Sequence, residues 1–218
     1  MVNQGISIDC ITEKEIKEGM RYTEYKRTIN DNGYKSMIKY NTIHGYIDIN
    51  DWTDIYMLPR LCTVSNVVRD FQFKILHRFL PTQSLLFKMQ KIDSPLCLYC
   101  NSSEGNLEHE MFDCLVIKNF WYEVMEAWNN LRNHSIVLDL RIVTLGYFCN
   151  SDSKYEHIAL NSLLLLGKLY VFHQKLKACA LSLMEFKHFL ATNVTNSASE
   201  NSDPTYSIIQ EFLSQEDN

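Results

Sequence analysis

Residues that break helices are scarce in this chain. Among its 218 residues there are 4 prolines and 7 glycines. Because these two residue types mark most turns, their scarcity predicts long helices. The chain is 46% apolar, so it can bury a real core, and its length suits one large domain or two small ones. We therefore expect a mostly α fold.

Signals for export and membrane insertion are also missing. The first 19 residues lack the basic and apolar regions of a signal peptide, and the apolar run 158–172 is interrupted by Asn161, Ser162 and Lys168. Seven cysteines, an odd number in a chain of this size, fit reduced thiols better than a disulfide framework. We expect an intracellular protein, in the nucleus or the cytoplasm, without a membrane span.

An excess of positive charge is absent from the chain as a whole. The formal net charge of -5 argues against a protein that coats nucleic acid over its entire surface, since such binding depends on many phosphate contacts. The segment 60–91 is the exception, with six basic side chains and one acidic side chain. Lys74 lies four residues from both Asp70 and Arg78, so a phosphate-binding face and a solvated helix face with weak ion pairs both fit this segment.

Hydrophobic periodicity places most of the expected helices. Val68, Phe71 and Ile75 recur at the spacing of a helix packed along one side, and Thr82 can cap the helix that follows Pro81. The expected helices span 12–29, 65–80, 83–90, 117–131, 155–177, 180–192 and 206–213, with an extended or loop segment at 41–52 and room for a short strand near 139–148.

Three cysteines and one histidine lie within the stretch CLYCNSSEGNLEHEMFDC, with the spacing C-x2-C-x8-H-x4-C. A structural zinc ion takes four ligands in a tetrahedron, and a C-x2-C pair supplies two thiolates from one tight turn while a distant pair completes the set. The alternative, three small buried cysteines and a surface histidine, is less favoured by the spacing. We predict a structural Zn2+ site, a zinc knuckle clamped between helices with no open position for catalysis, formed by Cys97, Cys100, His109 and Cys114.

Three acidic residues, Glu108, Glu110 and Asp113, lie beside the predicted ligands. Paired carboxylates can act in catalysis, but a charged side chain next to a ligand is more often solvated. We expect these three to face solvent, with at most one of them orienting a ligand.

These motifs together resemble a known family. The stretches WTDIYMLP (52–59), RDFQFKILHRFLPTQSLLFKM (69–89) and SPLCLYCNSSEGNLEHEMFDCLVIKNFW (94–121) are similar to the zinc-binding segment near the carboxyl end of reverse transcriptases from non-LTR, LINE-type retrotransposons. In that family a helix with a core like 71–78 leads into a CCHC cluster, and an F-W pair like the one at 120–121 follows it. The retroviral knuckle, C-x2-C-x4-H-x4-C, has a different spacing and matches less well.

The resemblance covers roughly residues 50–190 and implies a module that grips template RNA or target DNA beside a polymerase. The family's polymerase site needs two adjacent aspartates to hold its metal ions, and the sequence contains no Asp-Asp pair. We therefore expect a noncatalytic piece of such a protein, an element fragment or a host-retained derivative, without a small-molecule substrate. The expected organisation is an N-terminal helical lead-in at 1–50, the zinc-binding domain at 51–132, a C-terminal helical region at 133–193 and a flexible tail with a short helix at 194–218.

Two functions fit these features, and a relic with no selected task is a third interpretation. In the first, basic side chains meet phosphates and a tyrosine on the C-x2-C turn stacks on a base, which predicts binding to RNA or DNA without sequence reading. In the second, the acidic segments on either side of the basic one favour a structural or protein-interaction module. The residues predicted to contact nucleic acid are Arg69, Lys74, His77, Arg78, Lys88, Lys91 and Tyr99.

Overall fold

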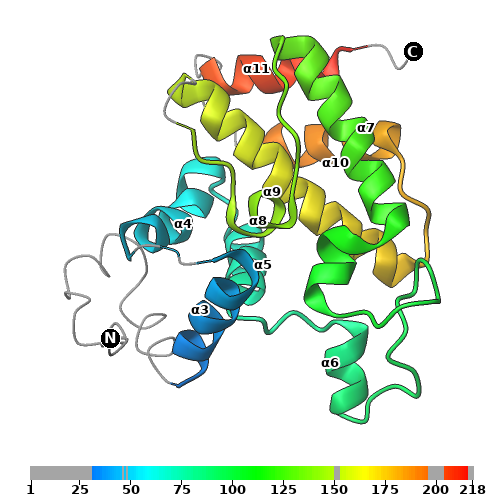
Figure 1. The fold of residues 1–218 in the computed structure, drawn as a ribbon. Helices are drawn as coiled ribbons and strands as arrows, with labels where there is room; N and C mark the ends of the chain where they lie inside the picture. The colour runs from blue at the N-terminus through cyan, green and yellow to red at the C-terminus, as the bar shows by residue number, and fades with distance from the viewer. Residues whose placement is uncertain (1–30, 46, 48, 150–152, 196–203, 216–218) are drawn as a thin grey trace.

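The computed structural model of the protein describes residues 31–45, 47, 49–149, 153–195 and 204–215. The helix expected at 12–29 lies outside these residues. The described helices are α3 (Asp31–His44), α4 (Ile49–Cys62), α5 (Asn66–Leu76), α6 (Gln83–Lys88), η2 (His109–Asp113), α7 (Leu115–Arg132), α8 (Leu140–Leu145), α9 (Lys154–Lys177), α10 (Leu183–Thr195) and α11 (Pro204–Leu213), as Figure 1 shows.

The mostly α prediction is confirmed, because the described part of the chain contains helices and one isolated β-bridge. The short strand expected near 139–148 is wrong, since this segment contains α8. Asp139 caps this helix by accepting a hydrogen bond from the backbone N–H of Ile142 over 2.7 Å. The extended or loop segment expected at 41–52 is also wrong in large part, because α3 runs to His44 and α4 begins at Ile49.

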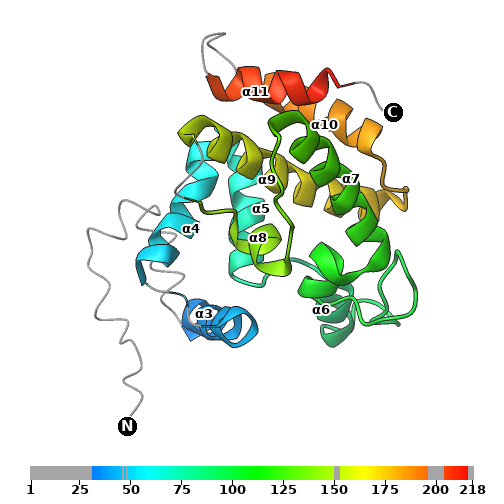
Figure 2. The same ribbon diagram turned by 45° about the horizontal axis from the view of Figure 1, so that its top comes forward.

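Helix α9 lies at the centre of the molecule. Figures 1 and 2 show it with α4, α5 and α8 on one side and α7, α10 and α11 on the other. Every residue from Ala159 to Val171 is buried, so this helix is covered all round and not on one face alone. None of the described helices combines the length and the apolar character that crossing a bilayer requires.

The predicted apolar stripes of α5 and α7 face this central helix. On α5, Val68, Phe71 and Ile75 are buried, whereas Val67 is exposed, as is Phe79 beyond the end of the helix. On α7 the stripe is buried with the exception of its half-buried last member; its residues are Ile117, Phe120, Trp121, Val124, Trp128 and Leu131.

The core joins segments that are far apart in the sequence. One cluster of buried apolar side chains extends from Val68 in α5 to Phe212 in α11. A smaller cluster contains Tyr40, Trp52 and Leu145, and the Tyr40 hydroxyl donates to the backbone carbonyl of Ile75 over 2.9 Å.

The last described helix, α11, is packed against the core. Its residues Ile208 and Phe212 are buried. Arg132 at the end of α7 pairs with Glu211 of α11 over 2.8 Å and with Glu156 of α9, so three helices meet at one guanidinium group. The short helix expected at 206–213 therefore forms and docks.

Candidate metal centre

The first half of the candidate site is a tight loop at 95–105, here called the knuckle. Leu96 and Glu104 form an antiparallel bridge, and the backbone N–H of Cys97 donates to the carbonyl of Ser103 over 2.8 Å. The chain reverses at Asn101, whose φ of 49° lies in the left-handed region that asparagine tolerates. The polar stretch NSSEG thus closes a small loop that projects two cysteines toward one point.

The second half comes from η2 and the residue that follows it. Asn106 accepts a hydrogen bond from the backbone N–H of His109 over 2.9 Å, which fixes the beginning of this turn. The N–H of Cys114 then donates to the carbonyl of His109 over 3.0 Å, five residues back. In a regular α-helix, residues five apart point about 140° away from each other. The wider i→i+5 turn, together with the extended backbone of Cys114, brings the two side chains to the same side.

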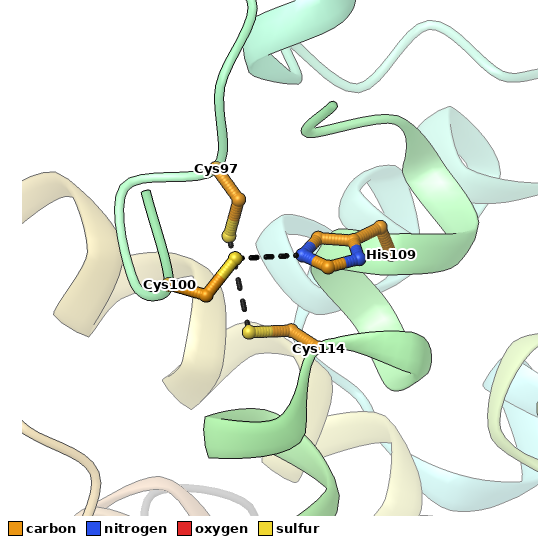
Figure 3. Close-up of side chains that lie close together, drawn as sticks. All are labelled: Cys97, Cys100, His109 and Cys114. Atoms are coloured by element: carbon orange, nitrogen blue, oxygen red, sulfur yellow. Dashed lines mark hydrogen bonds between the residues drawn. The ribbon is translucent and has the colours of Figure 1, made fainter. Parts of the chain in front are cut away.

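The four predicted ligands converge, as Figure 3 shows. One ligand atom from each of Cys97, Cys100, His109 and Cys114 lies within 4.8 Å of every other. The Cys97 and Cys114 sulfurs are 4.0 Å apart, and the Cys100 sulfur is 3.3 Å from Nε2 of His109. A tetrahedral zinc ion would set these two kinds of separation at about 3.8 and 3.6 Å. The geometry therefore suits one small ion.

Hydrogen-bond donors point at two of the three sulfurs, those of Cys97 and Cys100. Hydrogen bonds from the hydroxyl and the backbone of Ser102 lower the pKa of Cys100 to about 5. Burial raises the pKa of Cys97 to about 12, although the N–H groups of Tyr99 and Cys100 point at its sulfur and act in the opposite direction. A bound dication deprotonates a coordinating thiol outright, so it would reverse the effect of burial at Cys97.

The donor set can hold a metal ion but offers little for catalysis. Three thiolates and one imidazole fill all four positions of a tetrahedral ion, which leaves none for water or substrate. Within the described part of the chain, this is the one group of three or more Cys, His, Asp or Glu side chains arranged to bind an ion. Cys62, Cys149 and Cys179 lie outside this group.

No protein-family model matches the chain, and no curated protein is significantly similar to it in sequence. The resemblance to the reverse-transcriptase segment therefore stays a prediction that rests on the motifs. The geometry of the ligand set is independent of that resemblance.

The structure separates the predicted nucleic-acid contacts into three groups. Lys74, Lys88 and Lys91 are exposed, and Lys74 forms an exposed ion pair with Asp70 over 2.6 Å. Arg69 and Arg78 are half-buried and engaged: Nε of Arg69 donates to the carbonyl of Thr63 over 2.8 Å, and Arg78 pairs with Glu108 over 2.6 Å.

The two remaining predicted contacts face the protein interior. His77 is 2% exposed, so a phosphate cannot reach its ring in this conformation. The ring packs among aromatic side chains of α4 and α5, including Tyr56 and Phe73. Tyr99 is half-buried, and its hydroxyl donates to the carbonyl of Val171 on α9 over 2.9 Å.

Two charged residues near the site were missed. Glu110 was expected to face solvent, yet it is buried and forms an ion pair of 2.7 Å with the buried Lys175 of α9. The position of Glu110 directly after a ligand was the available signal, but nothing local indicated a partner 65 residues away.

Proposed function

We propose that this protein is a noncatalytic zinc-binding module, related to the zinc-binding segment of LINE-type reverse transcriptases, that contacts RNA or DNA. The convergence of Cys97, Cys100, His109 and Cys114 carries the metal-binding part of the proposal. Zinc is the ion that such a thiolate-rich tetrahedral set favours among common cellular metals. When bound, it would fasten the knuckle to the beginning of α7 and do no bond breaking.

The exposed lysines at one end of the molecule support the nucleic-acid part of the proposal. Lys88 and Lys91 lie at and just beyond the end of α6, beside the knuckle, and neither forms an ion pair with another described residue. Lys74 adds a third exposed charge on α5. With Arg78 neutralised by Glu108, the surface offers few phosphate contacts, so we expect weak, nonspecific and strongly salt-dependent binding.

Metal analysis of the purified chain tests the first part. We expect one Zn2+ per chain, and Co2+ substitution should give the absorption of a tetrahedral thiolate site. Cys114→Ser should weaken binding, because it removes one of four ligands, whereas Cys179→Ser should not, because Cys179 is exposed and lies outside the site. If the purified wild-type chain contains no metal and binds none after incubation with Zn2+, the metal-binding part of the proposal is wrong.

A salt titration of binding to single-stranded RNA and to duplex DNA tests the second part. We expect affinity to fall steeply as salt rises, because phosphate contacts release counterions. The variant Lys88→Glu/Lys91→Glu should bind more weakly, and Lys154→Glu/Lys177→Glu, which makes the same change of charge at two exposed positions on α9, is the matched control. Equal binding by both variants would contradict a contact surface at α6.

Exposed apolar side chains beside the knuckle favour a second candidate, a protein-interaction module. Leu98 and Leu115 directly follow two of the ligands and are 58% and 70% exposed, and Met89 at the end of α6 is 55% exposed. Such residues are uncommon next to a phosphate-binding surface and common in protein interfaces. Binding that does not depend on salt and is lost in Leu98→Ser/Leu115→Ser would favour this candidate.

A further inference from the structure

Two residues one turn apart on α9 contact the two halves of the candidate metal site. On the first half, the hydroxyl of Tyr99 donates to the backbone carbonyl of Val171 over 2.9 Å. On the second half, Nζ of Lys175 donates to Oε2 of Glu110 over 2.7 Å. Tyr99 lies between the two ligands of the C-x2-C turn, and Glu110 directly follows the ligand histidine. The same face of α9 therefore holds both parts of the ligand set.

The carboxylate of Glu110 lies at the meeting point of four segments. Its Oε1 accepts a hydrogen bond from the backbone N–H of Gln83 over 2.9 Å, at the first turn of α6. A Cβ added at Gly105 in the knuckle would lie 2.6 Å from the same oxygen, so only glycine fits there. Nζ of Lys175 also lies 3.4 Å from the carbonyl of Pro81. Glu110 thus joins α6, the knuckle, η2 and α9.

The ion pair is fully buried, which limits what it can add to stability. The side chains of Lys175 and Glu110 are 3% and 0% exposed. Removing two charges from water costs about as much free energy as their attraction returns. A protein with an apolar pair of similar size in their place is therefore often as stable. What an apolar pair cannot reproduce is the direction of the hydrogen bonds that orient Glu110 and its neighbouring ligand.

We propose that the contacts Tyr99–Val171 and Glu110–Lys175 form a clamp that holds the two halves of the metal site at the separation one ion needs. This inference rests on the proposed metal binding. Without the clamp, the ion itself has to order the knuckle and η2, and the entropy of that ordering reduces its affinity. Residues that orient metal ligands typically change metal affinity by about 10- to 100-fold. The clamp residues are therefore positioning residues for the site.

The test is the Zn2+ dissociation constant of the full chain, measured by competition with a chromophoric chelator. We expect Tyr99→Phe and the double variant Glu110→Gln/Lys175→Met each to weaken Zn2+ binding by about 10-fold or more. The double variant leaves no unpaired charge in the interior, so its fold should be retained. The matched control is Lys168→Met, because Lys168 is buried on the same helix but donates to Gln72 over 2.6 Å, away from the metal site.

The possible outcomes distinguish a wrong clamp proposal from a wrong metal-centre proposal. If the wild-type chain binds neither Zn2+ nor Co2+, the metal centre and the clamp are both wrong. If the wild-type chain binds Zn2+ and both clamp variants match its affinity, the clamp alone is wrong. An equal loss in Lys168→Met would also overturn the clamp, since the loss would then follow general destabilisation. Should the double variant fail to fold, Tyr99→Phe decides, because it removes one hydroxyl and keeps the ring.

Discussion

The imidazole of His77 is surrounded by aromatic rings. Its ring centroid lies 4.3 Å from that of Phe73 and 5.7 Å from that of Tyr56, and the residue is 2% exposed. Burial lowers the pKa of His77 from 6.5 to about 4, because the imidazolium would lose its hydration. The folded chain therefore binds this proton less readily than the unfolded chain does.

This difference predicts how acid affects stability. Between pH 6.5 and about 4 the unfolded chain holds more protons at His77, so the free energy of unfolding falls as the pH falls through this window. In His77→Phe we expect that fall to be smaller by up to about 3 kcal/mol. Urea denaturation of both chains at several pH values across the window measures the difference. Metal ligands also protonate in acid, but they do so in both chains and cancel; parallel pH profiles would contradict the prediction.

Individual residues could be predicted from the sequence where their partners lie nearby in the chain. The cap of α6 is an example, because Thr82 accepts a hydrogen bond from the N–H of Leu85 over 3.2 Å, three residues away. The four ligands lie within one short stretch and could be found from their spacing. Glu110 and Lys175 could not be paired in this way, because their contact depends on how α9 packs against η2.

At the scale of elements, α8 shows how tertiary contacts override local preference. Its β-branched residues Ile142, Val143 and Thr144 favour a strand when taken alone. In the structure, Asp139 caps a helix instead, and Gln72 of α5 donates to the carbonyl of Thr144 over 2.9 Å. The described part of the chain contains no strand that could pair with this segment. The secondary structure of a short apolar run therefore depends on its tertiary contacts.

Helices α7 and α9 meet through a glycine. A Cβ added at Gly167 of α9 would lie 2.6 Å from Cη2 of Trp121 on α7. The indole N–H of Trp121 donates to the carbonyl of Met111 in η2 over 2.8 Å, so the ring is held in place from the other side. The F-W pair that the sequence pointed to thus connects the central helix with the turn that carries the ligand histidine.

Gly167→Ala tests this contact. We expect it to lower the free energy of unfolding by about 1–3 kcal/mol, because the buried ring cannot move away without straining its neighbours. Helix propensity alone predicts the opposite, a gain of about 1 kcal/mol. Urea denaturation distinguishes the two. Trp121→Phe removes the atoms that clash, so in that background Gly167→Ala should lower the free energy of unfolding by less. If Gly167→Ala instead stabilises the chain that keeps Trp121, the ring moves away from the added methyl group and the prediction is wrong.

At the scale of the whole molecule, the mostly α class follows from the scarcity of proline and glycine, but the arrangement of the helices does not. The sequence indicated a long, mostly apolar run within α9, which is typical of a buried helix. Which helices cover it depends on contacts between distant residues, such as Arg132 with Glu156 and Glu211. The metal site adjoins this core, since Cys97 and Cys114 are themselves buried in it, and hydrogen bonds also connect the site with α9 and Trp121.

This arrangement predicts the effect of removing the metal ion. Small zinc domains unfold entirely without metal, because the ion supplies most of their folding free energy. Here most of the main core, which extends from Val68 to Phe212, lies outside the ligand set, and each fully buried large apolar side chain contributes about 1.5–3 kcal/mol. We therefore expect a chelator to lower the melting temperature and to loosen residues 95–114, while α5, α7 and α9 stay formed.

Amide hydrogen exchange measures this difference directly. In the structure the N–H groups of Cys97 and Cys114 are hydrogen-bonded within the site, so we expect them to exchange slowly in the metal-loaded chain. After chelation both should exchange faster than before, whereas the amides of α9 should stay protected and the circular dichroism of the helices should change little. A chelator presaturated with Mg2+ and Zn2+ is the control. Loss of all helical signal at room temperature would mean that the ion stabilises the entire core, because α9 would then depend on the site that it supports.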